Sequence, residues 1–348
     1  AYYRSSPTQI PGTDWASLEF VGGNKSGHGR AFAAIKSNRT LWGMGDSNTG
    51  QLLIAPSGTD VFRSSPTQLP GTTWASISVS NNSPSWSRLA IKTDGTLWGW
   101  GKNNYGMLGI NQPAPTNYSS PVQVGSGTDW SQCVVGEYLS NSFGLKTDGT
   151  LWSWGYNENG ILGTNETAAP AKKYSSPVQI PGTTWDGIAS DSYTALATRT
   201  DGTLWSWGQN YQGALGISAP SIYTRYSSPV QIPGTNWSTV HSSAGIVSAI
   251  KTDGTLWKWG NNSSGELGQN NTTKYSSPVQ IPGTNWSMGR GSYAVKTDGT
   301  LWAMGWNHQG KLGQNDLVNY SSPVQIPGTS WNAVLDMGYN AYATKSLS

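Results

Sequence analysis

The chain of 348 residues is poor in several residue types, and each shortage excludes a class of protein. Charged residues make up 11% of it and its net charge is +3, so it provides no strong field for nucleic acid. A single cysteine, Cys133, excludes an internal disulfide framework. No apolar run approaches the roughly 18 residues of a membrane helix, so we predict no membrane insertion. With three histidines and no Cys/His cluster, the sequence predicts neither a metal nor a cofactor.

Helical periodicity is also missing, and a repeat takes its place. No segment shows the 3.6-residue hydrophobic period of a helix. Three phrases recur in fixed order, SSPxQ seven times, GTxW seven times and TLWxxG six times. The SSPxQ copies begin 45 to 59 residues apart, at Ser5, Ser64, Ser119, Ser175, Ser227, Ser276 and Ser321. Such repetition indicates units that bury their cores against their neighbours.

Each repeat unit can be divided into four strands. In residues 227–268, SSPVQIP has proline near each end, which is typical of an edge strand. WSTVHSS and IVSAIK follow as strands, and TDGT forms a tight hairpin before the strand TLWKWG. Radial repetition of four-stranded units is a β-propeller, whereas solenoid units are shorter. We therefore predict that residues 1–348 form one all-β domain, a seven-bladed β-propeller of four-stranded antiparallel blades.

The number of strands leaves the last blade incomplete. The first SSPxQ segment, at 5–10, precedes the first GTxW segment, so we expect it to join the last blade. That blade has no TLWxxG copy before Ser348. We expect either that the sequence is a processed or truncated piece, or that another segment supplies the missing strand.

The phrases LWSWGQNYQGALG at 204–216 and LWGWGKNNYGMLG at 97–109 resemble the repeat of the regulator-of-chromosome-condensation family. The resemblance covers nearly the whole chain, and the G-x-N-x-x-G-x-L-G phrase is fairly specific. It implies a seven-bladed propeller. It does not imply one function, because members of this family range from exchange factors for a small GTPase to secreted inhibitors and ligand-binding modules.

Strand direction divides the connections between two faces. The tight turns between second and third strands lie on one face and are nearly identical, with Asp94, Asp148, Asp201, Asp253 and Asp298 in the same position. One carboxylate per turn cannot provide the ligands of a calcium ion. Asn38-Arg39 replaces Asp-Gly in the first unit, so we expect a different turn there. The loops on the other face vary in length and content, most in the first three blades, and we predict that they form the binding face.

Residues on that variable face are the candidates for partner binding, because aromatic and arginine side chains dominate interface hot spots. The candidates are Trp86, Arg88, Tyr105, Tyr211, Tyr223, Arg225, Trp306 and His308. The alternative is that the loops have only drifted, or that the aromatic rings pack over loop bases.

The recurring tryptophans are assigned to the packing of blade against blade, because they occupy the same position in each unit. The TLWxxG copies give Trp42, Trp98, Trp152, Trp205, Trp257 and Trp302 as core residues. His241 and Cys133 on GTxW strands are interpreted as structural residues. Glu137 and Glu158 are the nearest approach to a catalytic carboxylate pair, and they have no supporting neighbours, so we predict that the protein is not an enzyme.

These observations favour a binding or structural module with a protein or glycan partner on its variable face. The low charge and the surface rich in Asn, Ser, Thr and Gly resemble secreted bacterial or phage-encoded propellers, which suggests an extracellular or virion-surface location. Guanine-nucleotide exchange on a small GTPase, as the family resemblance implies, is the alternative. We predict no nucleic-acid partner.

Overall fold

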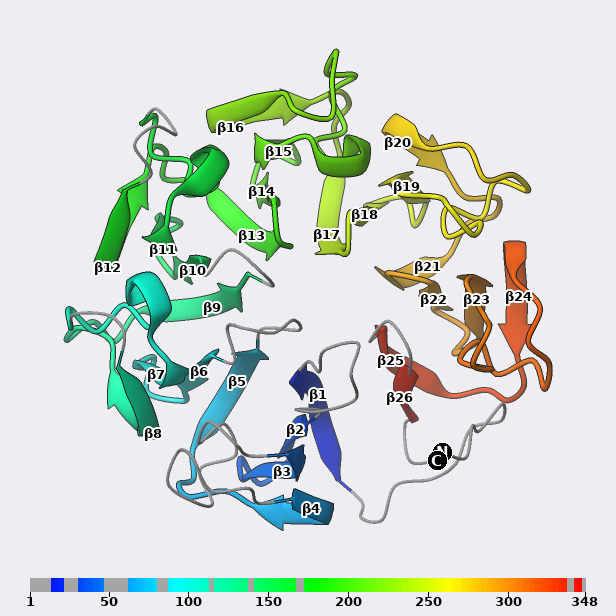
Figure 1. The fold of residues 1–348 in the computed structure, drawn as a ribbon. Helices are drawn as coiled ribbons and strands as arrows, with labels where there is room; N and C mark the ends of the chain where they lie inside the picture. Colours follow the sequence, from blue (N-terminus) through cyan, green and yellow to red (C-terminus); the bar gives the residue numbers. More distant parts are fainter. Residues whose placement is uncertain are drawn as a thin grey trace. The chain divides into compact units, whose positions relative to one another are not determined.

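The computed structural model of the chain describes residues 14–21, 31–46, 62–79, 87–112, 116–136, 141–166, 172–336 and 341–345. Its regular elements are β-strands and three short 3-10 turns, η1 (Asn104–Gly106), η2 (Glu158–Gly160) and η3 (Tyr211–Gly213). Within these ranges no helix has the length and hydropathy needed to cross a membrane. The strands of these described ranges form six four-stranded sheets and one two-stranded sheet (Figure 1).

Two compact units emerge from the contacts, one formed by Pro11–Tyr193 with Tyr226–Ser228 and another that contains Thr194–Arg225 and Pro229–Ser348. Three complete sheets lie in the unit formed by Pro11–Tyr193 with Tyr226–Ser228. The first contains β1 (Trp15–Val21), β2 (Ala31–Lys36), β3 (Leu41–Asp46) and β4 (Phe62–Gln68). The second contains β5 (Trp74–Val79), β6 (Ser87–Lys92), β7 (Leu97–Lys102) and β8 (Asn117–Gln123). The third contains β9 (Trp130–Val135), β10 (Asn141–Lys146), β11 (Leu151–Tyr156) and β12 (Lys173–Ile180).

The remaining sheets continue the same pattern. The fourth has β13 (Trp185–Ser190), β14 (Thr194–Arg199), β15 (Leu204–Gln209) and β16 (Arg225–Ile232). The fifth has β17 (Trp237–Ser243), β18 (Ile246–Lys251), β19 (Leu256–Gly260) and β20 (Tyr275–Gln280). The sixth has β21 (Trp286–Arg290), β22 (Tyr293–Lys296), β23 (Leu301–Gly305) and β24 (Tyr320–Ile326). Within the described residues the last sheet consists of β25 (Trp331–Asp336) and β26 (Ala341–Lys345).

The strand order confirms the division of each repeat. In every four-stranded sheet the strand that starts at the GTxW tryptophan is at one edge and the SSPxQ strand is at the other. The pairings are antiparallel, as in β18 with β19. Proline in the SSPxQ strand removes a donor from the ladder, and this is tolerated because that strand has only one neighbour. The fold is therefore an all-β propeller built from four-stranded antiparallel blades.

The described residues contain six complete blades and one partial sheet, whereas we predicted seven blades with the last one incomplete. The sheet of β25 and β26 corresponds to the first two strands of a further blade. The segment at 5–10, which we expected to join it, lies outside the described residues.

The hydrophobic core is built from two sets of tryptophans. One set is the second tryptophan of the third strand, and these side chains have no exposed area: Trp100, Trp154, Trp207 and Trp259. The other begins the first strand and is 2% to 8% exposed: Trp74, Trp130, Trp185, Trp237, Trp286 and Trp331. Large aromatic side chains bury more apolar area than any others, so these rings dominate the packing of the blades.

The tryptophans that we assigned to the core lie at its margin instead. Each is half-buried: Trp42, Trp98, Trp152, Trp205, Trp257 and Trp302. Each ring packs close to the tight turn two residues earlier, and its Nε1 donates to a threonine hydroxyl, as Trp257 does to Thr255 at 2.9 Å. Solvent reaches this end of the third strand, so the position suits an amphipathic ring better than a fully buried one.

The buried tryptophans also connect one blade to the previous one. The Nε1 of Trp154 donates to the carbonyl of Met107 at 2.9 Å, and that of Trp259 donates to the carbonyl of Ala214 at 2.9 Å. A glycine two residues after each acceptor allows the ring to approach, because a Cβ there would lie 2.7 Å from the Trp154 nitrogen at Gly109. The G-x-L-G phrase thus supplies the acceptor carbonyl and the glycine that the tryptophan of the next blade packs against.

Candidate binding face

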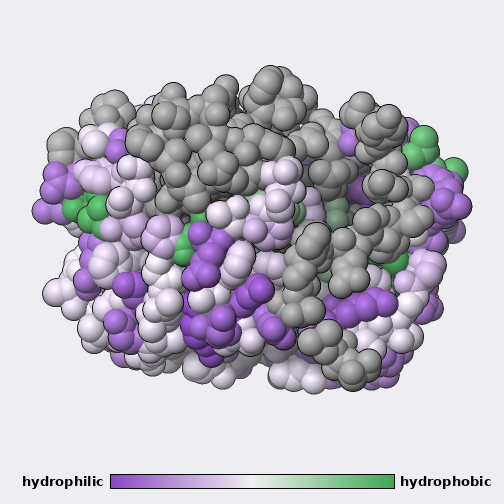
Figure 2. Space-filling model, turned by 90° about the horizontal axis from the view of Figure 1, so that it is seen from below, coloured by the Kyte–Doolittle hydropathy of each residue, from purple (hydrophilic) through white to green (hydrophobic). Residues whose placement is uncertain are grey.

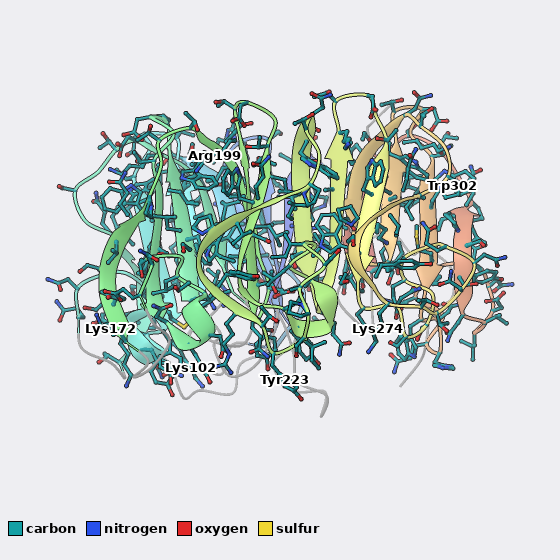
Figure 3. All side chains as sticks on the ribbon, turned by 90° about the horizontal axis from the view of Figure 1, so that it is seen from above. Lys102, Lys172, Arg199, Tyr223, Lys274 and Trp302 are labelled. Carbon is teal, nitrogen blue, oxygen red and sulfur yellow. The ribbon has the colours of Figure 1, made fainter. Side chains whose placement is uncertain are left out.

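Two ends of the blades can be distinguished by their connections. We call the turn end the one that carries the tight turns between second and third strands, such as 252–255. We call the loop end the opposite one, which carries the connections between third strands and SSPxQ strands, such as 210–224 and 262–274. Figure 3 shows this within the unit that contains Thr194–Arg225: Tyr223 and Lys274 lie toward one edge and Arg199 toward the other.

At the turn end the aspartates have a structural role. The carboxylate of Asp253 accepts hydrogen bonds from the backbone nitrogen and the hydroxyl of Thr255, at 2.9 and 2.6 Å. These bonds lower the pKa of the carboxyl, as they do at the four equivalent aspartates. The ammonium of Lys251 lies 4.7 Å from the ring centroid of Trp237 and 4.9 Å from that of Trp257. The Lys251 ammonium, the two tryptophan rings and the Asp253 carboxylate therefore all have partners within the turn end of their own blade.

The turn of the first blade does not differ, contrary to our expectation. The side-chain oxygen of Asn38 accepts from the backbone nitrogen and the hydroxyl of Thr40, at 3.2 and 2.6 Å, as the aspartates do elsewhere. Arg39 occupies the glycine position with φ of 66°. An amide oxygen replaces the carboxylate oxygen, so the hydrogen bonds survive while a non-glycine residue takes a left-handed conformation.

A recurring asparagine, which sequence reasoning missed, holds the start of five loops among the described residues. The Oδ1 of Asn210 accepts from the backbone nitrogen of Leu215 at 3.2 Å, and its Nδ2 donates to the carbonyl of Ser221 at 3.0 Å. Asn262 does the same with Leu267 and Thr273, at 2.9 and 2.7 Å. The signal was the repeated asparagine inside the G-x-N phrase. Because these side chains are buried, the loop backbones are rigid while their other side chains are free to vary.

Among the described residues, the large hydrophobic side chains that are exposed all lie at the loop end. In the part of the chain that the structure describes they are Tyr105, Tyr211, Ile222, Tyr223, Leu317 and Val318, which are 37% to 72% exposed. All six belong to connections between a third strand and an SSPxQ strand. Figure 2 shows the surface from one side, where hydrophobic areas are small and lie among hydrophilic ones. Of these six, the sequence predicts Tyr105, Tyr211 and Tyr223 as binding residues, whereas the three aliphatic residues were not predicted.

Tyr105 forms an aromatic and cationic cluster with the next blade. Its ring stacks on that of Tyr156, with centroids 4.7 Å apart and planes 20° apart. The ammonium of Lys173 lies 4.9 Å from the Tyr105 centroid. Beside them Lys172 forms an ion pair with Glu166 at 2.9 Å. Tyr105 also has φ of 59°, so this loop holds an aromatic residue in a conformation that costs energy outside glycine.

The other predicted binding residues differ in how exposed they are. Arg225 and His308 are exposed, and Trp306 is half-buried with its ring 5.5 Å from that of His308. Arg88 is 1% exposed, which corrects our prediction of a surface residue. It lies within β6, whose other residues are also almost entirely buried, and burial lowers its pKa to about 9. Trp86 lies outside the described residues, as do several loop segments of the first three blades.

A buried polar network at the loop end distinguishes the fifth and sixth blades. Lys258 has no exposed area, and its ammonium donates to the carbonyls of Glu266 and Gly291, both at 2.6 Å. Glu266 occupies the position of Met107 and Ala214, whose carbonyls accept from a tryptophan. The sixth blade has Met304 where that tryptophan would be, so lysine supplies the missing donor. Burial lowers the pKa of Lys258 to about 7.

An ion pair continues this network toward the last sheet. The ammonium of Lys311 lies 2.9 Å from Oδ1 of Asp336, and the other carboxylate oxygen accepts from the backbone nitrogen of Ser292 at 2.7 Å. Both charged side chains are less than a tenth exposed. The pKa of Asp336 is lowered, since the contacts with Lys311 and Ser292 outweigh its burial. A buried pair of this kind favours one arrangement of the two sheets.

His241 and Cys133, which we interpreted as structural, lie on first strands as expected. Burial, with the charge of Arg290, lowers the pKa of His241 to about 3, so it is neutral at physiological pH. Cys133 is half-buried on β9. Glu158 opens η2, and Glu137 lies outside the described residues. Within the ranges that the structure covers, no three His, Cys, Asp or Glu side chains gather as metal ligands would.

The blades and their repeated junctions define a β-propeller whose units share one sequence pattern. The model of the family described as "Regulator of chromosome condensation (RCC1) repeat" matches residues 94–140, 148–187, 201–250, 253–293 and 298–338. The chain belongs to this family. Sequence relatives include the human "Probable E3 ubiquitin-protein ligase HERC6", 26% identical over 189 residues. They also include "Protein RCC2 homolog" of Danio rerio, 30% identical over 175 residues.

These matches cover only parts of both partners. They take in 53% of this chain and 18% of the human protein, and 49% of this chain and 31% of the zebrafish protein. The chain therefore spans less than a third of the length of these relatives. The name of the human relative describes a ligase, and that activity belongs to a protein of which this chain resembles a minor part.

Solved structures show the same fold. Human WBSCR16 has a TM-score of 0.78 at 18% identity, over 95% of this chain and 87% of that chain. Prp20p of Saccharomyces cerevisiae has a TM-score of 0.74 at 18% identity, over 90% and 79%. Prp20p is described as binding Gsp1p and histones. The proteins named here are human, zebrafish and yeast proteins, so they do not support the bacterial or phage source, the virion role or the glycan partner that we expected.

Proposed function

We propose that the chain is a protein-binding propeller module that presents the loop end of its blades to a partner. The observation that carries the proposal is the distribution of exposed large hydrophobic side chains, which all occur on loop-end connections among the described residues. Exposed apolar groups on a rigid scaffold are typical of interaction sites. At the turn end, by contrast, cation and ring pairs are satisfied within each blade.

The kind of partner is supported by the structural neighbours. Prp20p is described as binding Gsp1p and histones, and it also has a structure in which Kap60 is bound to it; all of these partners are proteins. We propose that this chain likewise binds protein. Tyrosine and large aliphatic side chains fit this role, because a few such residues carry most of the energy of protein interfaces.

The experiment measures binding of the whole chain to purified histones and to Gsp1p by surface plasmon resonance. A loop-end variant combines Tyr105→Ser, Tyr223→Ser and Leu317→Ser, and it is expected to bind at least about tenfold more weakly, since hot-spot truncations cost about 1–2 kcal/mol or more. A matched turn-end variant combines Thr252→Ala and Thr297→Ala, both exposed, and is expected to bind normally. Equal binding by the loop-end variant, or no binding of the wild-type chain to either protein, contradicts the proposal.

Nucleotide exchange on a small GTPase is the second candidate. The likeness to Prp20p favours it, because Prp20p is described as binding Gsp1p. It predicts that the chain accelerates release of labelled GDP from a small GTPase. No acceleration at micromolar concentrations of the chain removes this candidate and leaves the binding proposal unaffected.

A further inference from the structure

We infer that the loop end of the fourth and fifth blades binds a protein segment that carries acidic side chains beside aromatic or aliphatic ones. This inference rests on the proposed function and names the partner chemistry for one part of the loop end. The part is a patch, here called the Tyr223 patch, that consists of Tyr211, Ile222, Tyr223, Arg225 and Lys274. All of it belongs to the unit that contains Thr194–Arg225 and Pro229–Ser348.

The loop that carries the patch is held rigidly by its own backbone. The nitrogen of Asn210 donates to the carbonyl of Thr224 at 2.8 Å, and the Asn210 side chain donates to Ser221 at 3.0 Å. The Ser221 hydroxyl accepts from the backbone nitrogen of Tyr223 at 3.1 Å. The nitrogen of Thr224 donates to the Ser221 carbonyl at 3.1 Å. The loop is therefore closed at its base, and its tip does not need to become ordered when a partner binds.

Its tip carries the most exposed large hydrophobic side chain among the described residues. Tyr223 is 72% exposed and Ile222 beside it is 47% exposed. Tyr211, in η3 of the same connection, is 37% exposed. The contacts that these three side chains make within the chain leave the exposed fractions open to solvent. A preformed loop that displays a tyrosine and an isoleucine to solvent has the properties of an interface anchor.

The fifth blade supplies a cation beside the loop. The backbone nitrogen of Ser218 donates to the carbonyl of Ser276 at 2.9 Å, and a Cβ on Gly213 would lie 3.1 Å from the Ser276 Cα. The loop thus lies against the start of β20. Lys274 immediately precedes that strand and is exposed. Arg225, which starts β16, is also exposed and follows Tyr223 by two residues.

The exposed charge of the patch has one sign. In residues 209–225 and 260–275 the charged residues are Arg225, Lys274 and Glu266. Glu266 is 6% exposed, and its carboxylate accepts from the backbone nitrogen of Ser264 at 2.8 Å. Only the two cations face solvent. A complementary partner therefore carries carboxylates, which meet Arg225 and Lys274, and apolar groups, which meet Tyr223 and Ile222.

A protein segment fits this patch better than a nucleic acid. Two exposed cations would neutralise few phosphates, whereas nucleic-acid affinity depends on many such contacts. Ile222 has no π-face on which a base could stack. An aliphatic side chain next to tyrosine is suited to apolar side chains of a peptide.

The experiment selects peptides from a random 12-residue display library on the immobilised full-length chain and measures their affinities by fluorescence anisotropy. The enriched peptides are expected to combine at least two acidic residues with an aromatic or aliphatic one. Their affinity is expected to fall at least tenfold with Tyr223→Ser and with Arg225→Gln combined with Lys274→Gln. It is expected to fall with added salt in the wild type and much less in the charge variant.

The control is the turn-end variant Thr252→Ala with Thr297→Ala, which is expected to leave these affinities unchanged. Tyr105→Ser, at an exposed loop-end tyrosine of another blade, tells this inference apart from the proposed function. Thermal unfolding confirms that each variant is folded. Sensitivity to Tyr105→Ser but not to Tyr223→Ser overturns this inference and leaves the proposed function standing. Sensitivity only to Thr252→Ala with Thr297→Ala at the turn end overturns both. Enrichment of neutral or basic peptides, the absence of enrichment, or competition by an equal concentration of a 12-nucleotide oligo-dT also overturns the inference.

Discussion

The turn end and the loop end of the same blades differ in how their side chains are used. At the turn end the lysine or arginine that ends each second strand lies over tryptophan rings, and the aspartate of each TDGT turn accepts from a threonine, as Lys251 and Asp253 show. At the loop end the backbone is equally regular, because an asparagine such as Asn210 holds each of the five connections whose start the structure describes. The side chains that point outward, however, differ from blade to blade. The repeat therefore maintains the scaffold at both ends and leaves only one end free to acquire specific contacts.

The largest effect is expected from the two tryptophans of one third strand. Trp259 is fully buried and bonds to the previous blade, whereas Trp257 is half-buried and bonds to the turn. Trp259→Ala is expected to lower the free energy of unfolding by about 3–5 kcal/mol, and Trp257→Ala by clearly less. Urea denaturation of both variants checks this. Equal losses would show that the two ends contribute equally to the core.

The next effect concerns the pH dependence of stability. The pKa of Lys258 is about 7 in the folded state, lowered from 10.5 by burial, while the charges of Asp336 and Glu266 act to raise it. Between these values the unfolded chain binds more protons, so the free energy of unfolding rises with pH. Below pH 7 the cost of burying the ammonium is fully present.

Lys258→Met removes this titration and provides the reference. The difference in unfolding free energy, wild type minus variant, is expected to increase by on the order of 1–3 kcal/mol between pH 6.5 and 9.5. Urea denaturation at several pH values measures it, and the subtraction cancels the other titrating groups. Parallel pH profiles of the two proteins would show that the pKa of Lys258 is not lowered in the folded state, which contradicts this prediction.

A smaller effect is expected when the junction between the fifth and sixth blades is changed to the form that the other junctions have. Lys258 supplies the donor that tryptophan supplies elsewhere, and Met304 occupies the tryptophan position. Lys258→Ser combined with Met304→Trp recreates the arrangement of the other junctions. A double-mutant cycle is expected to give a favourable coupling of about 0.5–3 kcal/mol. Strictly additive effects would mean that the two positions are independent.

The smallest effect is expected at the first turn. Arg39 has φ of 66° where the other turns have glycine. Arg39→Gly is expected to stabilise the chain by about 0.5–1 kcal/mol, because the side chain no longer opposes the left-handed conformation. Thermal unfolding measures the change. Gly254→Ala, which adds a side chain at the same position of an ordinary turn, is the matched control and is expected to have the opposite effect. If Arg39→Gly lowers the melting temperature, the arginine side chain has a role that the turn geometry does not reveal.

The four-stranded blades could be predicted from the sequence because the phrase that forms each strand recurs in several copies of the repeat. The edge position of the SSPxQ strand followed from its proline, and the tight turns followed from Asp-Gly. Burial within a strand could not be predicted as well. Trp257 and Trp259 share one face by period two, and only their distance from the turn decides that one is half-buried and the other fully buried.

The loop end was only partly predictable for a different physical reason. Tyr223 could be proposed because it interrupts a polar loop, but the exposure of Ile222 depends on how Asn210 and Ser221 close that loop. Arg88 looked like a surface residue because it follows a variable loop, whereas its strand is buried. The pairing of Lys258 with the Glu266 carbonyl depends on Met304 in another blade, and such a compensation is visible only in three dimensions.

Binding of partners at the loop end is tested most directly by hydrogen–deuterium exchange of the chain with a bound partner. A partner selected on the full chain, either a protein or an acidic peptide, should protect amides in 210–224 and 262–274. Exchange in the turns at 252–255 and 297–300 should stay the same as in the free chain. Protection that is confined to those turns, with unchanged exchange in the loops, would contradict the account.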